Sequence, residues 1–221
     1  LQLLGDGASV NAEQIRSALL ARIAEPYADE GGHDLTDGWG ASRLATAMLG
    51  AQGAIGLRRA AAADEALLLR WANDPQVRAN SFTPEPIDPA DHHHWFHAGQ
   101  ANPNRLQAIA KTADGCPIGQ IRFDREPAST EGGGSEATVD LSLDPCARGQ
   151  GLADELVRLG LQTMEQHWGP ATDAVAEVLP SNAASNACFA RAGFTSEAVS
   201  AIPPPSRAAT RWRWRPDASP C

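Results

Sequence analysis

The chain has 221 residues and a mass of 23.3 kDa, which suits one medium-sized domain with a short appended segment. Its net charge of -9 makes general binding to nucleic acid or to a membrane unexpected, and no apolar run is long enough to cross a bilayer. The composition, 43% hydrophobic and 20% charged, is typical of a globular protein and excludes disorder along the whole chain.

Residues 1–52 differ in pattern from the rest of the chain. Ile15, Leu19 and Ile23 lie on one face of a predicted helix, and a second short helix follows a glycine turn. Two short helices cannot bury a core alone, so we expect this segment to pack on the rest of the chain or on a missing neighbour. Because the first residue is Leu1 and not Met, we expect the chain to be a fragment of a longer product.

From residue 54 onward, strand and helix signals alternate. Strands are predicted at 54–58, 106–110, 118–123, 138–143, 175–179, 194–199 and 210–215. Helices are predicted at 62–72, 89–98, 182–192 and from the glycines at 149–151 to 168, with a flexible loop at 127–134. Asp88 and Pro89 suit the N-cap and the first position of a helix. The order of elements predicts an α/β fold with one mixed sheet and helices on both of its faces.

The cysteines give no sign of a scaffold or a zinc site. The four are scattered and form no C-x-x-C pair: Cys116, Cys146, Cys188 and Cys221. We interpret them as free thiols of a protein from a reducing, cytoplasmic compartment.

The segment from Asp140 to Ala153 carries the strongest chemical signal. A strand ends in a turn, and Arg148, Gly149 and Gly151 then lead into the long helix. A helix N-terminus presents unpaired N–H groups and a partial positive charge, and glycines let the backbone approach a ligand, so this segment could cradle a pyrophosphate. No Gly-Lys-Ser/Thr follows, and the third glycine of the dinucleotide fingerprint is missing. Taken alone, a glycine-rich turn that only begins a helix is an equally good interpretation.

A second segment, at 182–194, favours the pyrophosphate cradle over a simple glycine-rich turn. Together the two segments resemble the GCN5-related N-acetyltransferase (GNAT) superfamily, and the resemblance covers 54–215. The matching residues of the two family motifs are Arg148, Gly151, Ala153, Asn182, Ser185, Gly193 and Phe194. Phe189 stands where the family pattern has Tyr. The resemblance implies an acyl-CoA N-acyltransferase fold over 53–221, with a mostly antiparallel mixed sheet flanked by helices.

The same resemblance implies acetyl-CoA as cosubstrate and assigns the residues that hold it. These are Leu141, Ser142, Leu143, Arg148, Gly149, Gln150, Gly151, Leu152, Ala153, Asn182, Asn186 and Phe189. The backbone N–H of Leu143 is expected to face the thioester oxygen and to stabilise the developing oxyanion. Phe189 cannot donate a proton to the leaving thiolate, although a thiol of pKa about 8.5 can leave without that help.

The substrate amine is itself the nucleophile, so the enzyme needs a base and not a catalytic Ser or Cys. Asp140 and Glu177 are the candidates, since each lies on a strand beside the expected acetyl site. The alternative for both is an ordinary outward-facing polar residue. His92 begins a helix on the acceptor side, which favours substrate contact over proton abstraction.

A narrower resemblance concerns the acceptor. Residues 77–82, 85–87 and 117–124 look like acetyltransferases that act on nucleotide-linked amino sugars during synthesis of pseudaminic-type nonulosonic acids. The substrate-binding candidates are Arg78, Ser81, His92, Trp95 and Arg122. Residues 1–52, notably 37–43, resemble the tail of a fused nucleotide-sugar hydrolase domain, and no hydrolase activity is expected from this chain.

Two alternatives stay open beside a sugar-amine N-acetyltransferase. The acceptor could be a protein N-terminus or a polyamine, or the chain could be a non-catalytic acyl-CoA-binding module. Whichever function holds, the chain could form a homodimer. No metal site is expected: His93 and His97 share a helical face, but no H-E-x-x-H pattern or third ligand is evident in the sequence. Arg211 and Arg213 alternate with tryptophans, which predicts a half-exposed strand better than nucleic-acid stacking.

Overall fold

A computed structural model describes residues 46, 54–126, 135–197 and 208–216. Thr46 is therefore the one described residue of the expected N-terminal segment, and the boundary of that segment near residue 52 stays a prediction. The loop expected at 127–134 and the end of the strand expected at 194–199 also lie outside the described residues.

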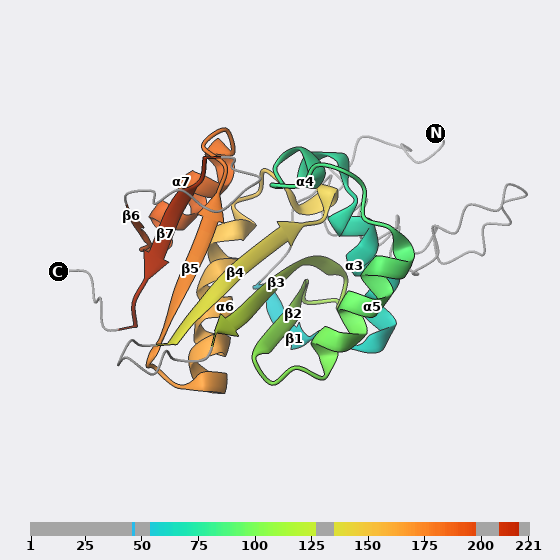
Figure 1. The fold of residues 1–221 in the computed structure, drawn as a ribbon, viewed down its shortest axis with the longest axis horizontal. Helices are drawn as coiled ribbons and strands as arrows, with labels where there is room; N and C mark the ends of the chain where they lie inside the picture. Colours follow the sequence, from blue (N-terminus) through green and yellow to red (C-terminus); the bar gives the residue numbers. More distant parts are fainter. Residues whose placement is uncertain (1–45, 47–53, 127–134, 198–207, 217–221) are drawn as a thin grey trace, which may run out of the picture.

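The fold is built on one seven-stranded sheet with the order β1-β2-β3-β4-β5-β7-β6 (Figure 1). The strands are β1 Gly56–Arg59, β2 Arg105–Lys111, β3 Pro117–Glu126, β4 Ser135–Leu143, β5 Thr172–Val178, β6 Thr195–Glu197 and β7 Thr210–Trp214. Every neighbouring pair is antiparallel except β4 and β5, which run parallel. The expected mixed, mostly antiparallel sheet is confirmed, as is the hairpin from β2 to β3.

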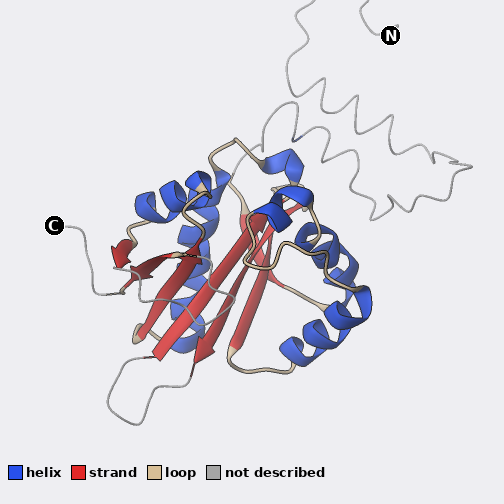
Figure 2. Cartoon of the chain, turned by 45° about the horizontal axis from the view of Figure 1, so that its top comes forward, coloured by secondary structure: helices blue, strands red, loops and turns tan. Residues whose placement is uncertain are grey.

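Helices cover both faces of the sheet, as the order of elements predicted (Figure 2). The helical elements are η1 Ala62–Asp64, α3 Glu65–Ala72, α4 Pro75–Ala79, α5 Pro89–Gln100, η2 Pro145–Ala147, α6 Leu152–Trp168 and α7 Ala183–Arg191. On one face Trp71 of α3 and Phe96 of α5 pack with Ile109 of β2. On the other face Leu156 and Val157 of α6 pack with the strands in a larger core.

Aspartate followed by proline begins two of the helices. The Asp88 carboxylate accepts hydrogen bonds from the N–H groups of Ala90 and Asp91 at 2.8 and 3.3 Å, and it caps α5 as predicted. Asp74 caps α4 in the same way, with Pro75 at the first helical position. The five residues of α4 are too few to give a helical periodicity, so the sequence pattern missed this helix.

The turn between β4 and α6 is anchored to the opposite layer. Asp144 is 4% exposed, and its carboxylate accepts a hydrogen bond from Trp71 Nε1 of α3 at 2.8 Å. The same carboxylate accepts the N–H of Cys146 at 3.0 Å, which shapes the first turn after β4. These bonds hold the start of α6 against the end of β4.

Candidate active site

The parallel strands β4 and β5 separate part-way along their length. Their ladder runs from Ser135 and Thr172 to Thr138 and Val175, while the other edge of β5 pairs with β7 as far as Val178. The second half of β4 is therefore paired only with β3 among the described strands. A gap opens between the carboxyl-terminal ends of the two central strands.

The free edge of β4 presents backbone hydrogen-bonding groups to this gap. The N–H of Asp144 donates to the carbonyl of Ile118 of β3 at 2.9 Å. Because hydrogen-bonded pairs alternate along an antiparallel ladder, the N–H and C=O groups of Val139, Leu141 and Leu143 point away from β3 and toward β5. The edge can therefore pair with an extended ligand that lies between the strands, as a further strand would.

The N-terminus of α6 lies at the end of the same gap. Gly149 and Gly151 have φ of 73° and 74°, a left-handed conformation that favours glycine. A Cβ at either position would meet no described atom within 4 Å, so the space in front of the loop is open. Gly151 caps a helix of 17 residues, whose first N–H groups and partial positive charge suit an anion. The loop and the helix start together fit a phosphate group.

A cavity of about 340 Å³ occupies the gap. It is lined by residues of α4, β4, the start of α6, the end of β5 and α7: Gln76, Val77, Asn80, Ser81, Val139, Asp140, Leu141, Ser142, Leu143, Arg148, Gly149, Ala153, Glu177, Val178, Asn182, Ala184, Ser185, Cys188 and Phe189. Ten of the residues that the sequence assigns to acetyl-CoA or to catalysis are brought together here. Gln76, Val77 and Asn80 were missed, because they belong to the short helix α4.

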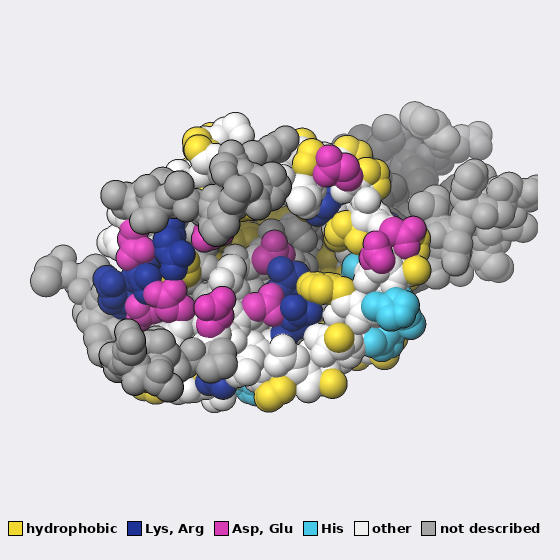
Figure 3. All heavy atoms as spheres, in the orientation of Figure 1, with side chains coloured by type: hydrophobic (Ala, Val, Ile, Leu, Met, Phe, Trp, Pro, Cys, Tyr) yellow, Lys and Arg dark blue, Asp and Glu magenta, His cyan; other side chains and the backbone are white. Residues whose placement is uncertain are grey.

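Two carboxylates reach the cavity from adjacent strands. Asp140 of β4 has a side chain that is 53% exposed, and it accepts a hydrogen bond from Gln120 Nε2 at 2.7 Å. Glu177 of β5 lies 3.4 Å from Arg211 Nη1. In the space-filling view, acidic side chains lie beside the hollow in the middle of this face (Figure 3). Both candidate bases therefore border the cavity, and each faces an arginine: Asp140 Oδ1 lies 4.0 Å from Arg122 Nη1, and Glu177 lies closer to Arg211.

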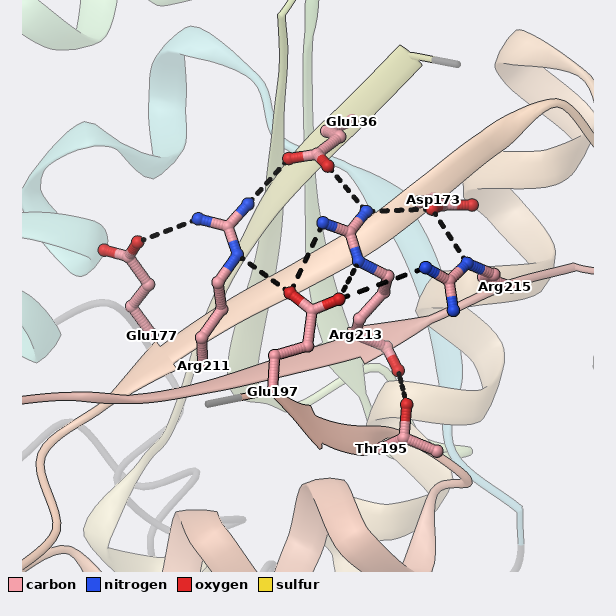
Figure 4. Close-up of polar contacts among 8 residues, drawn as sticks. All are labelled: Glu136, Asp173, Glu177, Thr195, Glu197, Arg211, Arg213 and Arg215. Carbon is pink, nitrogen blue, oxygen red and sulfur yellow. Dashed lines mark hydrogen bonds and ion pairs between the residues drawn. The ribbon is translucent and has the colours of Figure 1, made fainter. Parts of the chain in front are cut away.

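Arg211 belongs to an ion-pair network that joins the strands β4, β5, β6 and β7 (Figure 4). Its guanidinium lies 2.7 Å from Glu136 and 3.3 Å from Glu197. Arg213 contacts Glu136, Glu197 and Asp173 at 2.5, 2.5 and 2.9 Å, and its hydrogen bond to Glu197 lowers the pKa of that carboxyl group. The predicted half-exposed strand is confirmed. Arg211 and Arg213 therefore form ion pairs with carboxylates on their own face of the sheet.

Arg148 lines the cavity but is engaged by protein groups. Its Nε donates to the carbonyl of Leu143 at 3.0 Å, its Nη1 donates to Gln76 Oε1 at 3.0 Å, and its Nη2 lies 2.8 Å from Asp74. The side chain thus joins β4 to α4. The phosphate-binding capacity of the loop rests on its backbone N–H groups, with Arg148 supplying charge from the side.

Other predicted residues point elsewhere. Asn186 donates to the carbonyls of Leu179 and Asn182 at 3.0 and 2.9 Å and accepts from Trp212 Nε1 at 2.9 Å, so it anchors α7 to the sheet. Gln150 donates to the carbonyls of Cys146 and Thr46 at 2.7 and 3.0 Å. Neither is among the described residues that line the cavity.

The residues expected to bind the acceptor do not all lie at the cavity. Ser81 lines the cavity, whereas Arg78 donates to the carbonyls of Thr83 and Glu85 at 3.1 and 3.4 Å and holds the loop after α4. His92 is 3% exposed and stacks on Phe96 at 5.9 Å. Burial lowers the pKa of His92, so its ring is neutral at neutral pH.

Trp95 and Arg122 form a separate pair beside these residues. Arg122 Nε donates to Asp124 at 2.7 Å, and the guanidinium groups of Arg122 and Arg105 lie 4.9 and 4.4 Å from the Trp95 ring centre. The two do not belong to the cavity as the described residues outline it.

A second hollow of about 680 Å³ lies along the outer side of α6. Its walls include Asp154 and Arg158 of α6, Arg191 at the end of α7 and Trp214 of β7, and Gly151 lies at its edge. The glycine loop therefore stands between the two hollows.

Family comparison agrees with this geometry. Residues 54–195 match the family model described as an acetyltransferase (GNAT) domain. The chain belongs to the GNAT acetyltransferase family. No curated protein matches the sequence at a significant level.

GNAT enzymes of known structure share the fold. A spermidine N-acetyltransferase from Vibrio cholerae, crystallised with CoA and spermine, is 15% identical with a TM-score of 0.59 and aligns over 72% of this chain and 92% of its own. The aminoglycoside acetyltransferase AAC(6')-Ib, crystallised with coenzyme A, is 21% identical with a TM-score of 0.61 and aligns over 73% and 95%. The predicted fold class and family are confirmed, and the narrower resemblance to sugar-amine enzymes stays a prediction.

Phe189 is the departure from the GNAT pattern. It is 3% exposed, lines the cavity and packs edge-on against Phe194 at 5.0 Å. Its neighbour Cys188 also lines the cavity, but burial raises the pKa of that thiol to about 12. At Cys188 and Phe189 the cavity wall therefore offers neither a hydroxyl group nor a thiolate at neutral pH.

The described residues contain neither a disulfide nor a helix that could span a membrane. Cys116, Cys146 and Cys188, the cysteines that the structure describes, form no disulfide. Of the helices within the described residues, none combines the length and the apolar character that crossing a bilayer needs.

Proposed function

We propose that this GNAT domain transfers an acetyl group from acetyl-CoA to the primary amine of a small acceptor. The observation that carries the proposal is the gap between β4 and β5, which has a phosphate-compatible helix N-terminus at one end and two carboxylates at its mouth. A donor with an extended arm and a diphosphate fits these features together.

The arrangement of the hollows suits acetyl-CoA in one orientation. The diphosphate would lie against the N–H groups from Gly149 to Ala153, and the pantetheine arm would pair with the free edge of β4. The nucleotide end would then extend toward the hollow beside Arg158 and Arg191. This orientation brings the thioester to the end of β4, next to the N–H of Leu143.

The chemistry then needs few groups. The amine nitrogen forms a bond to the acetyl carbon, the carbon–sulfur bond breaks, and the sulfur leaves as a thiolate that takes a proton from water. The Leu143 N–H donates to the carbonyl oxygen as negative charge develops there. Asp140 takes a proton from the substrate ammonium, directly or through water, which frees the amine to attack, and the nitrogen releases its second proton to solvent as the carbon–sulfur bond breaks. Asp140 is favoured over Glu177 because it is more exposed, 53% against 30%, and its contact with Arg122, at 4.0 Å, is longer than the 3.4 Å contact of Glu177 with Arg211.

Charge at the cavity favours a cationic acceptor. Asp140 and Glu177 line the cavity, whereas Arg78 and Arg122, the two arginines expected to bind a phosphate, are held by other protein groups. A polyamine or an aminoglycoside, the acceptor classes named for the two neighbours above, carries several ammonium groups. Such an acceptor can place one amine at the thioester and another beside a carboxylate.

A nucleotide-linked amino sugar is the second candidate. It is favoured by the sequence resemblance of 77–82, 85–87 and 117–124, and Trp95 with Arg105 and Arg122 offers an aromatic and cationic surface on the same face of the sheet. To bind this acceptor, Arg122 has to give up its hydrogen bond to Asp124 and donate to a phosphate group instead.

A thiol-release assay tests the proposal. The protein is mixed with acetyl-CoA and, in separate wells, with spermidine, an aminoglycoside, a UDP-linked amino sugar and an N-terminal peptide. Turnover on the cationic amines supports the first candidate, and turnover on the nucleotide sugar alone supports the second. Binding of acetyl-CoA without turnover on any amine would contradict an enzyme and favour an acyl-CoA-binding module.

A further inference from the structure

A cluster of possible metal ligands lies on the surface where α3 meets α5. His93 and His97 are four residues apart on α5 and so share one face of the helix, with ring centres 4.4 Å apart. Glu65, the first residue of α3, faces both rings. His93 Nδ1 lies 2.8 Å from one carboxylate oxygen and His97 Nε2 lies 3.0 Å from the other.

The three side chains have the chemistry and the spacing of a zinc site. Their ligand atoms all lie within 4.8 Å of one another. In a tetrahedral site with bonds of about 2.0–2.2 Å, neighbouring donor atoms are about 3.4 Å apart, so the separations between the donor atoms need to change by at most about 1.4 Å. Exposed fractions of 57% for His93, 43% for His97 and 28% for Glu65 leave the side chains room for that movement.

We propose that Glu65, His93 and His97 form a binding site for a divalent transition-metal ion, with zinc as the expected occupant. Two imidazole nitrogens and one carboxylate suit Zn²⁺. Mg²⁺ and Ca²⁺ are hard ions that prefer oxygen ligands alone, so this ligand set disfavours them. Water fills the fourth position, since the cluster is open to solvent. In the space-filling view the histidines form an exposed patch over α5 (Figure 3).

Metal binding at this site replaces the two hydrogen bonds between Glu65 and the rings by three coordinate bonds, one from each side chain. In the structure the ring N–H groups of both histidines face the carboxylate, which can only accept. When the ion binds through Nδ1 of His93 and Nε2 of His97, each neutral ring carries its proton on the other nitrogen, and no redox change is involved. The ion then joins the first turn of α3 to α5.

The site is separate from the proposed acetyl transfer. None of the three residues is among the described residues that line the cavity between β4 and β5. The two helices it connects pack over β2 through Trp71, Phe96 and Ile109. A bound ion is therefore expected to stabilise this layer of the fold and to leave turnover unchanged.

Zinc titration of the untagged full chain tests the inference. After treatment with a chelator, isothermal titration calorimetry with zinc chloride is expected to show one equivalent that is lost in His93→Ala and His97→Ala. Affinity should fall by at least about 100-fold, since loss of a direct ligand costs more than the roughly 10–100-fold cost of losing an outer hydrogen-bond partner. Glu65→Gln keeps a hydrogen-bonding partner for both rings and serves as the variant least liable to misfold.

His94→Ala is the matched control. His94 lies on the same helix and is exposed, but its Nδ1 is 2.7 Å from the carbonyl of Ala90 on that helix. This variant is expected to bind zinc as the wild type does. A Co²⁺ spectrum without thiolate charge-transfer bands excludes the cysteines as ligands. Absence of saturable zinc binding, equal binding by His93→Ala, or a loss in His94→Ala would each overturn the inference.

Discussion

Replacement of Gly151 separates the anion-binding role of the α6 N-terminus from its structural role. Gly151 has φ of 74°, so any side chain costs about 1–2 kcal/mol of folding stability there. The added Cβ itself meets no described atom within 4 Å. Gly151→Ala is therefore expected to lower stability and to leave the affinity for acetyl-CoA within about fivefold.

Gly151→Glu adds a negative charge where the diphosphate is expected. Two unit charges about 6 Å apart repel by about 3 kcal/mol at an effective dielectric constant of about 20, and salt at about 0.15 M reduces this by about half. Because the diphosphate carries two negative charges, the total screened repulsion is again about 3 kcal/mol, which corresponds to roughly a hundredfold weaker binding of acetyl-CoA. Both variants carry the same cost of a side chain at a positive φ, so the difference between their affinities for acetyl-CoA measures the effect of the added charge.

Calorimetric titration with acetyl-CoA measures this difference, and urea unfolding measures the shared loss of stability. The gap between the two variants should narrow as sodium chloride rises from about 50 to about 500 mM, because salt screens exposed charges. If Gly151→Glu binds acetyl-CoA within fivefold of Gly151→Ala at low salt, the diphosphate does not lie at this helix end.

Three further results are expected. Asp140→Asn should lower kcat by about 10²-fold or more, whereas Glu177→Gln should cost less; equal losses would contradict the choice of base. Gly119→Ala should destabilise the fold by about 1–3 kcal/mol in urea and raise KM for acetyl-CoA, because its Cβ would lie 2.6 Å from the Ser142 carbonyl oxygen on β4; unchanged kinetics would mean that β4 tolerates the shift. The pKa of Cys188 is raised to about 12, so the folded thiol keeps its proton when the unfolded one has lost it, and stability should fall above pH about 9 by up to about 1.4 kcal/mol per pH unit. That slope should be absent in Cys188→Ala, and an identical slope in unfolding experiments would refute the assignment.

Local signals in the sequence predicted much of the fold. Asp88 with Pro89 placed the start of α5, the glycines at 149–151 placed the start of α6, and turn residues placed the hairpin from β2 to β3. Each signal acts within a few residues, which is why it can be read without the tertiary structure. Asp74 with Pro75 carried the same signal for α4 and was overlooked, since five residues show no period.

Long-range pairings could not be predicted in the same way. The separation of β4 from β5 depends on where the ladder between them stops, at Thr138 and Val175, and this ladder pairs residues that are over thirty positions apart in the chain. The engagement of Arg148 by Asp74, of Asn186 by Trp212 and of His93 by Glu65 each joins residues far apart in the chain. Residue type and local spacing do not specify such partners.

A crystal structure of the chain with CoA shows whether the diphosphate binds at the N-terminus of α6 with the acyl arm between β4 and β5. Phosphate oxygens are expected about 2.7–3.2 Å from backbone nitrogens between Gly149 and Ala153, with the pantetheine arm along the free edge of Leu141 and Leu143. Density for the ligand at any other place on the protein would contradict this placement.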